Sequence, residues 1–213
     1  SPGLDTIRRM TLLDRGALEA ALGAPLGARN LLVTFHPVTL EPDYGMAQLE
    51  ALLAALDTLP ADCIFWVTQA NADTHGAAFA RRMTAWAATR PGQVRLHTSL
   101  GQLRYLSLMA QVDAVVGNSS SGLYEAPSFK VPTVDIGNRQ AGRLASASVI
   151  ACAPEPKAIA DALACALSGD YADVVNPYGD GDSSRRIVAI LRAVPDYRAL
   201  LHKTFALLEN DHD

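Results

Sequence analysis

Charged residues, aromatic residues and cysteine are all scarce in this chain of 213 residues. Asp, Glu, Lys and Arg make up 19% and aromatic residues 6%, whereas 49% of the residues are hydrophobic, enough to build a sizeable core. The net charge of -4 is spread without long runs of either sign, so we expect no nucleic-acid or anionic-membrane partner. The chain also lacks a signal peptide and an apolar run of roughly 18 residues, which predicts a soluble, cytoplasmic protein.

The three cysteines, Cys63, Cys152 and Cys165, are far apart and lie among apolar residues. This pattern predicts reduced thiols in the core, with neither a disulfide nor a metal role. The histidines stand in unrelated contexts, and no H-E-x-x-H, paired C-x-x-C or facial-triad spacing occurs, so we expect no metal site. A Walker A lysine and a G-x-G-x-x-G after a strand are also absent, which excludes two common phosphate-binding motifs.

Short apolar segments alternate with segments of helical periodicity along the chain. The predicted strands are 31–35, 63–68, 94–97, 112–116, 133–136 and 149–152. The predicted helices are 14–22, capped by Asp14 and ended by Gly23, then 44–59, 77–89, 100–111, 156–167 and two in the tail 183–208, interrupted near Pro195. This order predicts one α/β domain over residues 1–213, a three-layer sandwich whose parallel sheet of about six strands is covered on both faces.

Residues 112–143 are the most informative stretch, because they combine a strand, a polar turn, a short helix, a second strand and a basic loop. Asn118, Ser119, Ser120 and Ser121 follow the first strand, and Gly122 would let the backbone approach a ligand closely. We predict a helix over 123–129 whose free N–H groups and dipole face a phosphate above the serines. Glu125, in its first turn, is then placed to accept two hydrogen bonds from a ribose diol, so the segment predicts a nucleotide site.

Two other interpretations of the serine run compete with this one. A serine-rich tetrad is most often a flexible, solvated turn. Here it is clamped between two apolar strands, and open parallel sheets bind ligands at the carboxyl ends of their strands. A serine nucleophile in the G-x-S-x-G elbow would need glycine at position 121, which is Ser121, so that motif does not fit.

Polar residues also follow the other predicted strands, and these ends should line one crevice. His36 precedes a proline and is more often a structural residue than a ligand contact, Ser99 could cap the next helix, and 68–73 reads equally well as ordinary turn chemistry. The loop 137–143 carries Arg139 and Arg143, either solvated or offering bidentate hydrogen bonds to phosphate. The carboxylates near this crevice, Asp73, Glu125 and Asp135, form no convincing acid and base pair.

Several of these segments together resemble the hydrolysing UDP-N-acetylglucosamine 2-epimerases. The segments are Thr-Phe-His-Pro-Val-Thr at 34–39, Asn-Ala-Asp at 71–73, Gly-Asn-Ser-Ser-Ser-Gly at 117–122, Glu-Ala-Pro at 125–127 and Gly-Asn-Arg-Gln-Ala-Gly-Arg at 137–143. The serine turn with the G-x-R-Q-x-G-R loop is fairly specific, because non-hydrolysing relatives tend to carry a different serine and glycine turn. The resemblance is to the family's carboxyl-terminal half and covers nearly the whole chain.

The resemblance implies a glycosyltransferase-B-like architecture of two Rossmann-like domains with the substrate between them. This chain would be the second domain and its amino-terminal partner is absent, which fits a processed or excised fragment that begins at Ser1 without methionine. Members of the family often dimerise, so a homodimer is a further expectation. By motif position, Ser119 and Ser120 would hold the diphosphate, together with Ser121 and Gly122 of the same turn. Glu125 would hold the ribose, while His36, Asn71 and Arg139 line the nucleotide site.

The implied reaction inverts C2 of the sugar and cleaves its bond to UDP, by elimination and water addition, giving N-acetylmannosamine without cofactor or essential metal. The catalytic acids are expected on the absent domain, so we expect this fragment alone to be inactive; His36 is its one catalytic candidate. A 2,4-diacetamido sugar and use in sialic acid or another nonulosonic acid pathway stay open. Two other functions also stay open: a nucleotide-sugar-dependent glycosyltransferase domain and a non-catalytic nucleotide-binding module.

Overall fold

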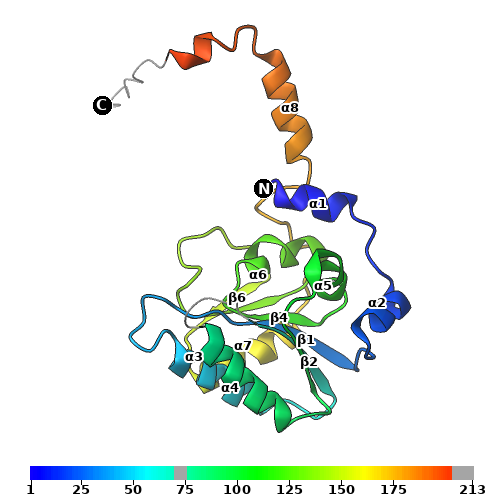
Figure 1. The fold of residues 1–213 in the computed structure, drawn as a ribbon, viewed down its shortest axis with the longest axis vertical. Coiled ribbons are helices and arrows are strands. Elements are labelled where there is room, and N and C mark those ends of the chain that lie inside the picture. The colour runs from blue at the N-terminus through cyan, green and yellow to red at the C-terminus, as the bar shows by residue number, and fades with distance from the viewer. Residues whose placement is uncertain (70–75, 203–213) are drawn as a thin grey trace.

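The computed structural model describes residues 1–69 and 76–202. Its centre is a six-stranded, all-parallel sheet with the strand order β3-β2-β1-β4-β5-β6 (Figure 1). The strands are β1 (Arg29–Thr34), β2 (Cys63–Thr68), β3 (Val94–His97), β4 (Ala114–Gly117), β5 (Thr133–Ile136) and β6 (Val149–Cys152). The predicted parallel sheet is therefore confirmed. Strands at 63–68, 94–97, 133–136 and 149–152 match residue for residue, and the other two are shifted by one or two residues.

Helices cover both faces of this sheet, as the alternating β and α order predicts. The helices α3 (Met46–Leu56), α4 (Gly76–Ala88) and α7 (Pro156–Ser168) pack on one face. The other face carries α2 (Arg15–Leu22), α5 (Gly101–Met109), the short α6 (Ser121–Tyr124) and the 3₁₀ helix η1 (Ala126–Phe129). Asp14 caps α2 as predicted, because its carboxylate accepts a hydrogen bond of 2.8 Å from Ala17 N.

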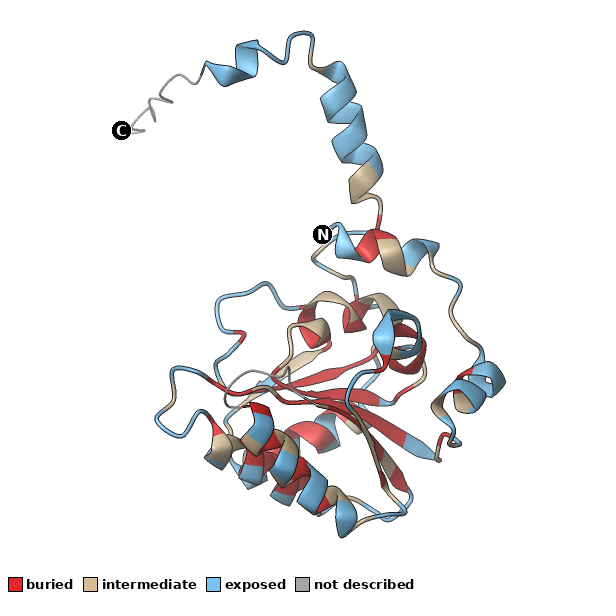
Figure 2. Ribbon diagram, viewed as in Figure 1, coloured by how far each residue is buried: buried red, intermediate tan, exposed pale blue. Residues whose placement is uncertain are grey.

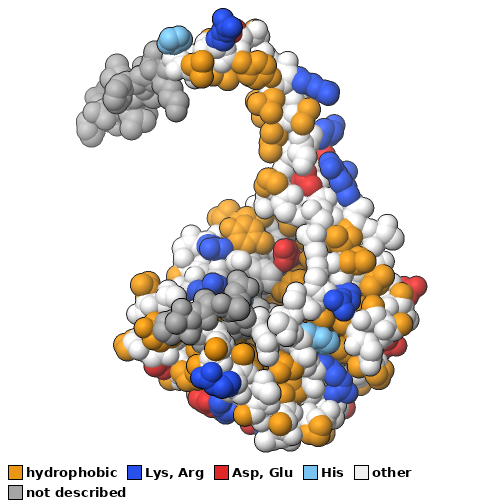
Figure 3. All heavy atoms as spheres, viewed as in Figure 1, with side chains coloured by type: hydrophobic (Ala, Val, Ile, Leu, Met, Phe, Trp, Pro, Cys, Tyr) orange, Lys and Arg blue, Asp and Glu red, His pale blue; other side chains and the backbone are white. Residues whose placement is uncertain are grey.

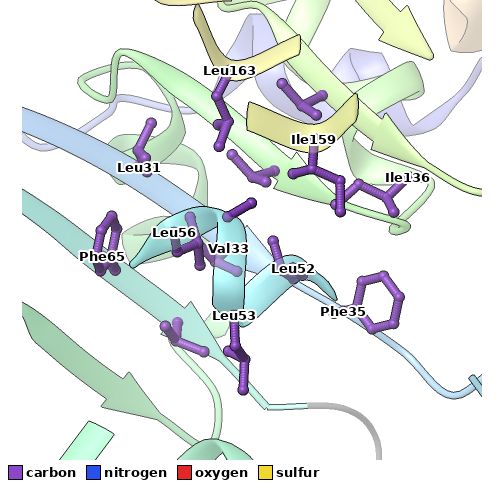
Figure 4. Packing of buried hydrophobic residues seen from close by; sticks show 14 of the residues in the cluster. Leu31, Val33, Phe35, Leu52, Leu53, Leu56, Phe65, Ile136, Ile159 and Leu163 are labelled. Atoms are coloured by element: carbon purple, nitrogen blue, oxygen red, sulfur yellow. The ribbon is translucent and has the colours of Figure 1, made fainter. Parts of the chain in front are cut away.

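Alternate residues of the central strands point to opposite sides of the sheet, and both sides are buried (Figure 2). Leu31 and Val33 face the layer of α3, α4 and α7, where Leu52 and Ile159 meet them (Figure 4), whereas Leu32 faces α2 and α5. This double burial explains why the strands are nearly continuous apolar runs and were predictable. Among the cysteines, Cys63 is buried as predicted but Cys165 is exposed, so its predicted core position is wrong.

The chain passes from β1 outward to β2 and β3, and then returns to pair β4 with the other edge of β1. The boundary between β1 and β4 is therefore the point where the strand order reverses. In open α/β sheets, ligands bind in the crevice that forms at this point, beyond the carboxyl ends of the strands. The loop after β1 begins at His36 and the loop after β4 contains the serine run, so the topology brings these two predicted segments together.

The largest departure from the predicted elements lies in residues 121–129. A single helix over 123–129 was expected, but the chain forms α6, which starts at Ser121, and then η1, which follows Glu125. Pro127 in the first turn of η1 explains the break, because proline has no N–H to donate to the carbonyl four residues earlier, that of Leu123. Glu125 consequently lies at the junction of two short helices and not in the first turn of one.

Two helices extend from the sandwich and contact one another, α1 (Gly3–Arg9), which was not predicted, and α8 (Ser183–Ala193). The carboxylate of Asp5 accepts hydrogen bonds from Ser183 N (2.9 Å) and Ser184 N (2.6 Å) at the start of α8. The tail contains α8 and a 3₁₀ turn, η2 (Ala199–Leu201), on either side of Pro195, and its remainder lies outside the described residues. Within the described part of the chain, no helix combines the length and hydropathy that a membrane crossing requires.

Candidate functional site

The turn that follows β4 is pressed against the end of β1. Gly117 has a φ of +137°, and a Cβ placed there would lie 1.9 Å from the carbonyl oxygen of Thr34, so only glycine fits. The next residue, Asn118, is fully buried, and its side-chain amide contacts the backbone of His36. Asn118 Oδ1 accepts from His36 N at 2.8 Å and Asn118 Nδ2 donates to His36 O at 2.9 Å. This amide joins the loops after β1 and β4.

Ser119 and Ser120 carry the donors of the serine turn. The predicted donors were the first N–H groups of a helix from 123, but Leu123 N and Tyr124 N already donate to Ser120 O. The backbone N–H groups of Ser119 and Ser120, by contrast, donate to no residue that the structure describes. The available donors therefore lie one turn earlier than the sequence indicated.

A cavity of about 590 Å³ opens between the loops after β1, β4 and β5. Its lining includes His36, Ser119, Ser120, Asn138 and Arg139, together with the loop 37–41. The Arg139 guanidinium is fixed at the rim because Nη1 donates to Asn118 O at 3.0 Å, and the neighbouring Gln140 Nε2 donates to the same oxygen at 2.7 Å. Arg139 and two serines whose N–H groups have no acceptor among the described residues thus line one cavity, and these are the groups that bind an anionic phosphate.

Ser121 and Gly122 belong to the same turn but lie behind this cavity. The hydroxyl of Ser121 is 2.6 Å from Tyr105 Oη and 3.2 Å from Ser119 Oγ. Gly122 is buried against β5, where a Cβ would lie 2.4 Å from Thr133 Cγ2, and its carbonyl accepts from Thr133 Oγ1 at 2.9 Å. Glycine at position 122 is therefore explained by its packing against β5, whereas the sequence suggested that it lets the backbone approach a ligand closely.

Glu125 lines a smaller cavity of about 170 Å³, which it shares with Ser120, Ser121 and Tyr124. Burial raises the pKa of the Glu125 carboxyl. None of the described residues donates a hydrogen bond to this carboxylate, so its lone pairs are available to a ligand. Because Ser120 lines both this cavity and the larger one, a single ligand can contact the serine turn and Glu125.

A third cavity, of about 390 Å³, lies over the carboxyl ends of β1, β2 and β3. Its lining includes Tyr105, Ser119 and Ser121, the amide side chains of Gln69 and Gln102, and the start of α5. The three cavities meet at the serine turn, at the reversal of strand order. Together the three cavities form one extended site for a ligand with an anionic centre and two polar ends.

The sequence model of the family described as UDP-N-acetylglucosamine 2-epimerase matches residues 1–192. The chain belongs to this family.

Curated relatives agree with this membership. A GDP/UDP-N,N'-diacetylbacillosamine 2-epimerase (hydrolyzing) of Campylobacter jejuni is 39% identical over 68% of this chain and 37% of its own length. A UDP-N,N'-diacetylbacillosamine 2-epimerase (hydrolyzing) of Legionella pneumophila is 32% identical over 95% of this chain and 53% of its own length. The chain therefore spans about half, or less, of the length of these relatives.

A solved structure shares the fold. The Methanocaldococcus jannaschii UDP-GlcNAc 2-epimerase in complex with UDP-GlcNAc and UDP has a TM-score of 0.64 and 16% identity, over 82% of this chain and 48% of that structure. The α/β fold with its six parallel strands matches one half of such glycosyltransferase-B-like structures.

The fold of this epimerase-family chain brings most of the predicted site residues together. His36, Ser119, Ser120 and Arg139 line the largest cavity of the site, and Glu125 lies in the adjoining one. Asn71 and Asp73 lie outside the described residues. Ser99 accepts a hydrogen bond of 3.2 Å from Gly101 N just before α5 begins.

Two residues of this region were not singled out from the sequence. Asn118 was named only as one polar residue of the turn, and Tyr105 only fell within the predicted helix 100–111. Burial raises the pKa of the Tyr105 hydroxyl, which contacts Ser121 and stays protonated at neutral pH. A polar tip on the buried face of a helix beside a serine turn was the signal available for Tyr105.

Proposed function

We propose that this chain is the nucleotide-binding half of a hydrolysing UDP-N-acetylglucosamine 2-epimerase, which inverts C2 and releases N-acetylmannosamine and UDP. The observation that carries the proposal is that Ser119 and Ser120, whose N–H groups donate to none of the described residues, line one cavity with Arg139 at the reversal of strand order. The family membership and the hydrolysing relatives support the reaction type.

In this proposal the diphosphate occupies the largest cavity. The N–H groups of Ser119 and Ser120 donate to phosphate oxygens, and Arg139 supplies a positive charge held in place by Asn118 O. As the bond between the sugar and UDP breaks, negative charge grows on the leaving phosphate. Fixed donors stabilise that charge without reorganisation, so this half contributes to the rate as well as to binding.

The nucleoside extends from the diphosphate toward the other two cavities. The Glu125 carboxylate accepts hydrogen bonds from the ribose hydroxyls, for which its unshared lone pairs are suited. The base occupies the third cavity, where Gln69, Gln102 and backbone groups of the loop before α5 offer polar partners. His36 lines both the first and the third cavities and lies at the centre of the nucleotide site.

The acid and base groups that act on the sugar belong, in this proposal, to an amino-terminal half of the same protein. The helix α8 supports this division, because none of its residues is buried and Ile187, Val188, Ile190 and Leu191 form one exposed apolar face (Figure 3). Such a stripe on a projecting helix is typical of a packing surface. We propose that the amino-terminal half covers it.

A second candidate substrate is a 2,4-diacetamido sugar nucleotide. The relatives at 39% and 32% identity both carry N,N'-diacetylbacillosamine in their names, which favours this candidate. Both substrates present the same UDP to this half, so the choice between them rests on groups that contact the sugar. Full-length protein incubated with each nucleotide sugar in heavy water would distinguish them. Only the true substrate should be converted, and elimination followed by water addition should place deuterium at C2 of its product.

Calorimetric titration of the 213-residue chain tests the UDP site itself. UDP should bind, pyrophosphate should bind more weakly, and UDP binding should weaken as salt rises because charge contributes to it. GDP serves as the matched ligand that differs in the base alone. Absence of UDP binding at millimolar concentrations by a chain with native circular dichroism would contradict the proposal.

A further inference from the structure

A chain of hydroxyl groups runs from the ends of β1 and β2 to the serine turn. Thr68 Oγ1 lies 2.5 Å from Thr34 Oγ1, and the Thr34 hydroxyl lies close enough to that of Tyr105 to lower the Tyr105 pKa. Tyr105 Oη lies 2.6 Å from Ser121 Oγ, which lies 3.2 Å from Ser119 Oγ. Thr34 and Thr68 are buried, at 5% and 7% exposure, and both line the third cavity.

Such a chain has a direction, because each hydroxyl carries one hydrogen and can donate it once. If every hydroxyl donates toward the serine turn, Ser121 donates to Ser119 and the Ser119 hydrogen is left for a ligand. If the direction is reversed, Ser119 donates inward and presents a lone pair to the ligand. An anion beside Ser119 selects the first direction, and aligned hydroxyls polarise one another in the low dielectric of the interior.

Tyr105 is the residue of this chain that contacts the serine turn, through its hydrogen bond with Ser121. Burial raises the pKa of its hydroxyl, and the negative charge of Glu125 raises it further, so Tyr105 remains a donor. Its ring packs beside the apolar cluster of α2 and α5. Phenylalanine at this position would preserve the ring packing and remove the hydroxyl alone.

We propose that Tyr105 is a positioning residue for the diphosphate, which acts by donating to Ser121 and so turning the Ser119 hydroxyl toward the ligand. The inference rests on the proposed UDP site and adds a residue that contacts no phosphate itself. Tyr105 also lines the third cavity, where the proposal places the base, so uridine and pyrophosphate are needed to separate a role through Ser119 from a direct contact with the nucleoside.

The test compares wild type, Tyr105→Phe, Ser121→Ala and the double variant, with UDP and pyrophosphate followed by calorimetry and uridine by NMR shift titration. Loss of one net hydrogen bond predicts a decrease of about 3- to 10-fold in affinity for UDP and pyrophosphate in Tyr105→Phe. Uridine affinity should not change, and the double variant should bind UDP no more weakly than Ser121→Ala, because both changes interrupt one chain.

Tyr171→Phe is the matched control, since its hydroxyl donates to Cys165 O at the exposed end of α7. It should bind UDP as wild type does. Unchanged UDP affinity in Tyr105→Phe, an equal loss for uridine, or additive losses in the double variant would each overturn the role of Tyr105. Failure of the wild-type chain to bind UDP would overturn the proposed function itself, which keeps the two outcomes distinguishable.

Discussion

The side chain of Asn118 binds the backbone of His36 at both its N–H and its carbonyl, at 2.8 and 2.9 Å. The carbonyl of Asn118 in turn accepts from Arg139 and Gln140, so this residue joins the loops after β1, β4 and β5. These three loops line the largest cavity of the site. A fully buried asparagine therefore sets the relative position of groups that come from separate parts of the chain.

Replacing Asn118 with alanine should reduce both stability and UDP binding. The change removes both hydrogen bonds between the Asn118 side chain and the half-buried backbone of His36, which costs about 2–4 kcal/mol of unfolding free energy. Urea unfolding at neutral pH measures that loss. Calorimetry under conditions in which the variant is still folded should show UDP affinity reduced by at least tenfold, a factor that corresponds to about 1.4 kcal/mol.

Asn30 offers a matched control at the opposite end of β1. Its side chain also binds one residue twice, with Oδ1 accepting from Gly27 N at 2.9 Å and Nδ2 donating to Gly27 O at 3.1 Å. Asn30→Ala should therefore lower stability by a comparable amount and leave UDP affinity unchanged in the folded protein. Equal losses of UDP affinity in the two variants would show that general destabilisation, and not the position of the loops, accounts for the effect.

Glu125→Ala should weaken UDP binding by roughly 1–3 kcal/mol, because charged hydrogen bonds to the ribose hydroxyls are lost. Calorimetry with UDP, 2',3'-dideoxy-UDP and pyrophosphate checks the assignment. The substitution should cost nothing further with the dideoxy nucleotide and nothing with pyrophosphate. A loss of the same size for all three ligands would mean that the carboxylate supports the turn and does not hold ribose.

The contribution of Glu125 to UDP affinity should decrease as pH falls. Burial raises the pKa of this carboxyl, so its charged form is lost earlier on acidification than that of an ordinary glutamate. The difference in UDP affinity between wild type and Glu125→Gln should shrink as pH falls through the raised pKa. Comparison of the two proteins at each pH removes the titration of the phosphate, which is common to both.

The strands, and the sheet covered by helices on both faces, were predictable, because a parallel strand buried on both faces must be apolar throughout. The strand 133–136 and the strand 63–68 were placed to the residue for this reason. The helix at α1 could not be placed, since it is only seven residues long, begins with Gly3, which has low helix propensity, and contacts α8, far away in sequence.

The composition of the site was predictable and its hydrogen bonding was not. A turn of asparagine and serines after a buried strand indicates an anion site by type. Which N–H groups are available depends on where α6 begins, and it begins at Ser121, two residues before the predicted start at 123. The roles of Tyr105 and Asn118 depend on partners in other loops, and a single sequence contains no local signal of those pairings.

Asp135 should make the stability of this chain fall as pH rises. It is a buried carboxyl at the end of β5, and burial raises its pKa to about 6 from a usual value of 3.8, against the opposing effect of Arg139. A raised pKa means that the folded state holds the proton more tightly than the unfolded state. Stability is therefore full below the unfolded pKa and declines as pH rises toward about 6.

Asp135→Asn should remove this decline. The shift corresponds to about 3 kcal/mol, so the variant should be more stable than wild type by up to that amount at pH 8 and nearly equal to it at pH 4. Urea unfolding at several pH values measures the difference. Asp161→Asn, a change of the same kind on an exposed ion pair of α7, should show no such trend. A pH-independent difference for Asp135→Asn would contradict the assignment.

Asp5 should control the order of α8, the helix whose apolar face we assign to the amino-terminal half. The carboxylate accepts from Ser183 N and Ser184 N, and the polar groups of Ser184, followed by those of Ser183, lower the pKa of Asp5 to about 2. The contribution of a carboxyl with a lowered pKa is present above the usual 3.8 and is lost as pH falls toward about 2. The cap should therefore operate throughout the neutral range.

In Asp5→Ala, amide hydrogen exchange should accelerate in α8, because the first N–H groups of the helix lose their acceptor. Exchange followed by mass spectrometry should show the change in peptides that cover 183–193 and none in the sheet. Asp43→Ala is the matched control, since Asp43 caps α3 through Gly45 N and Ala47 N, and it should accelerate exchange in α3 alone. Unchanged exchange in α8 of Asp5→Ala would mean that its contacts with α1, and not the carboxylate, hold the helix in place.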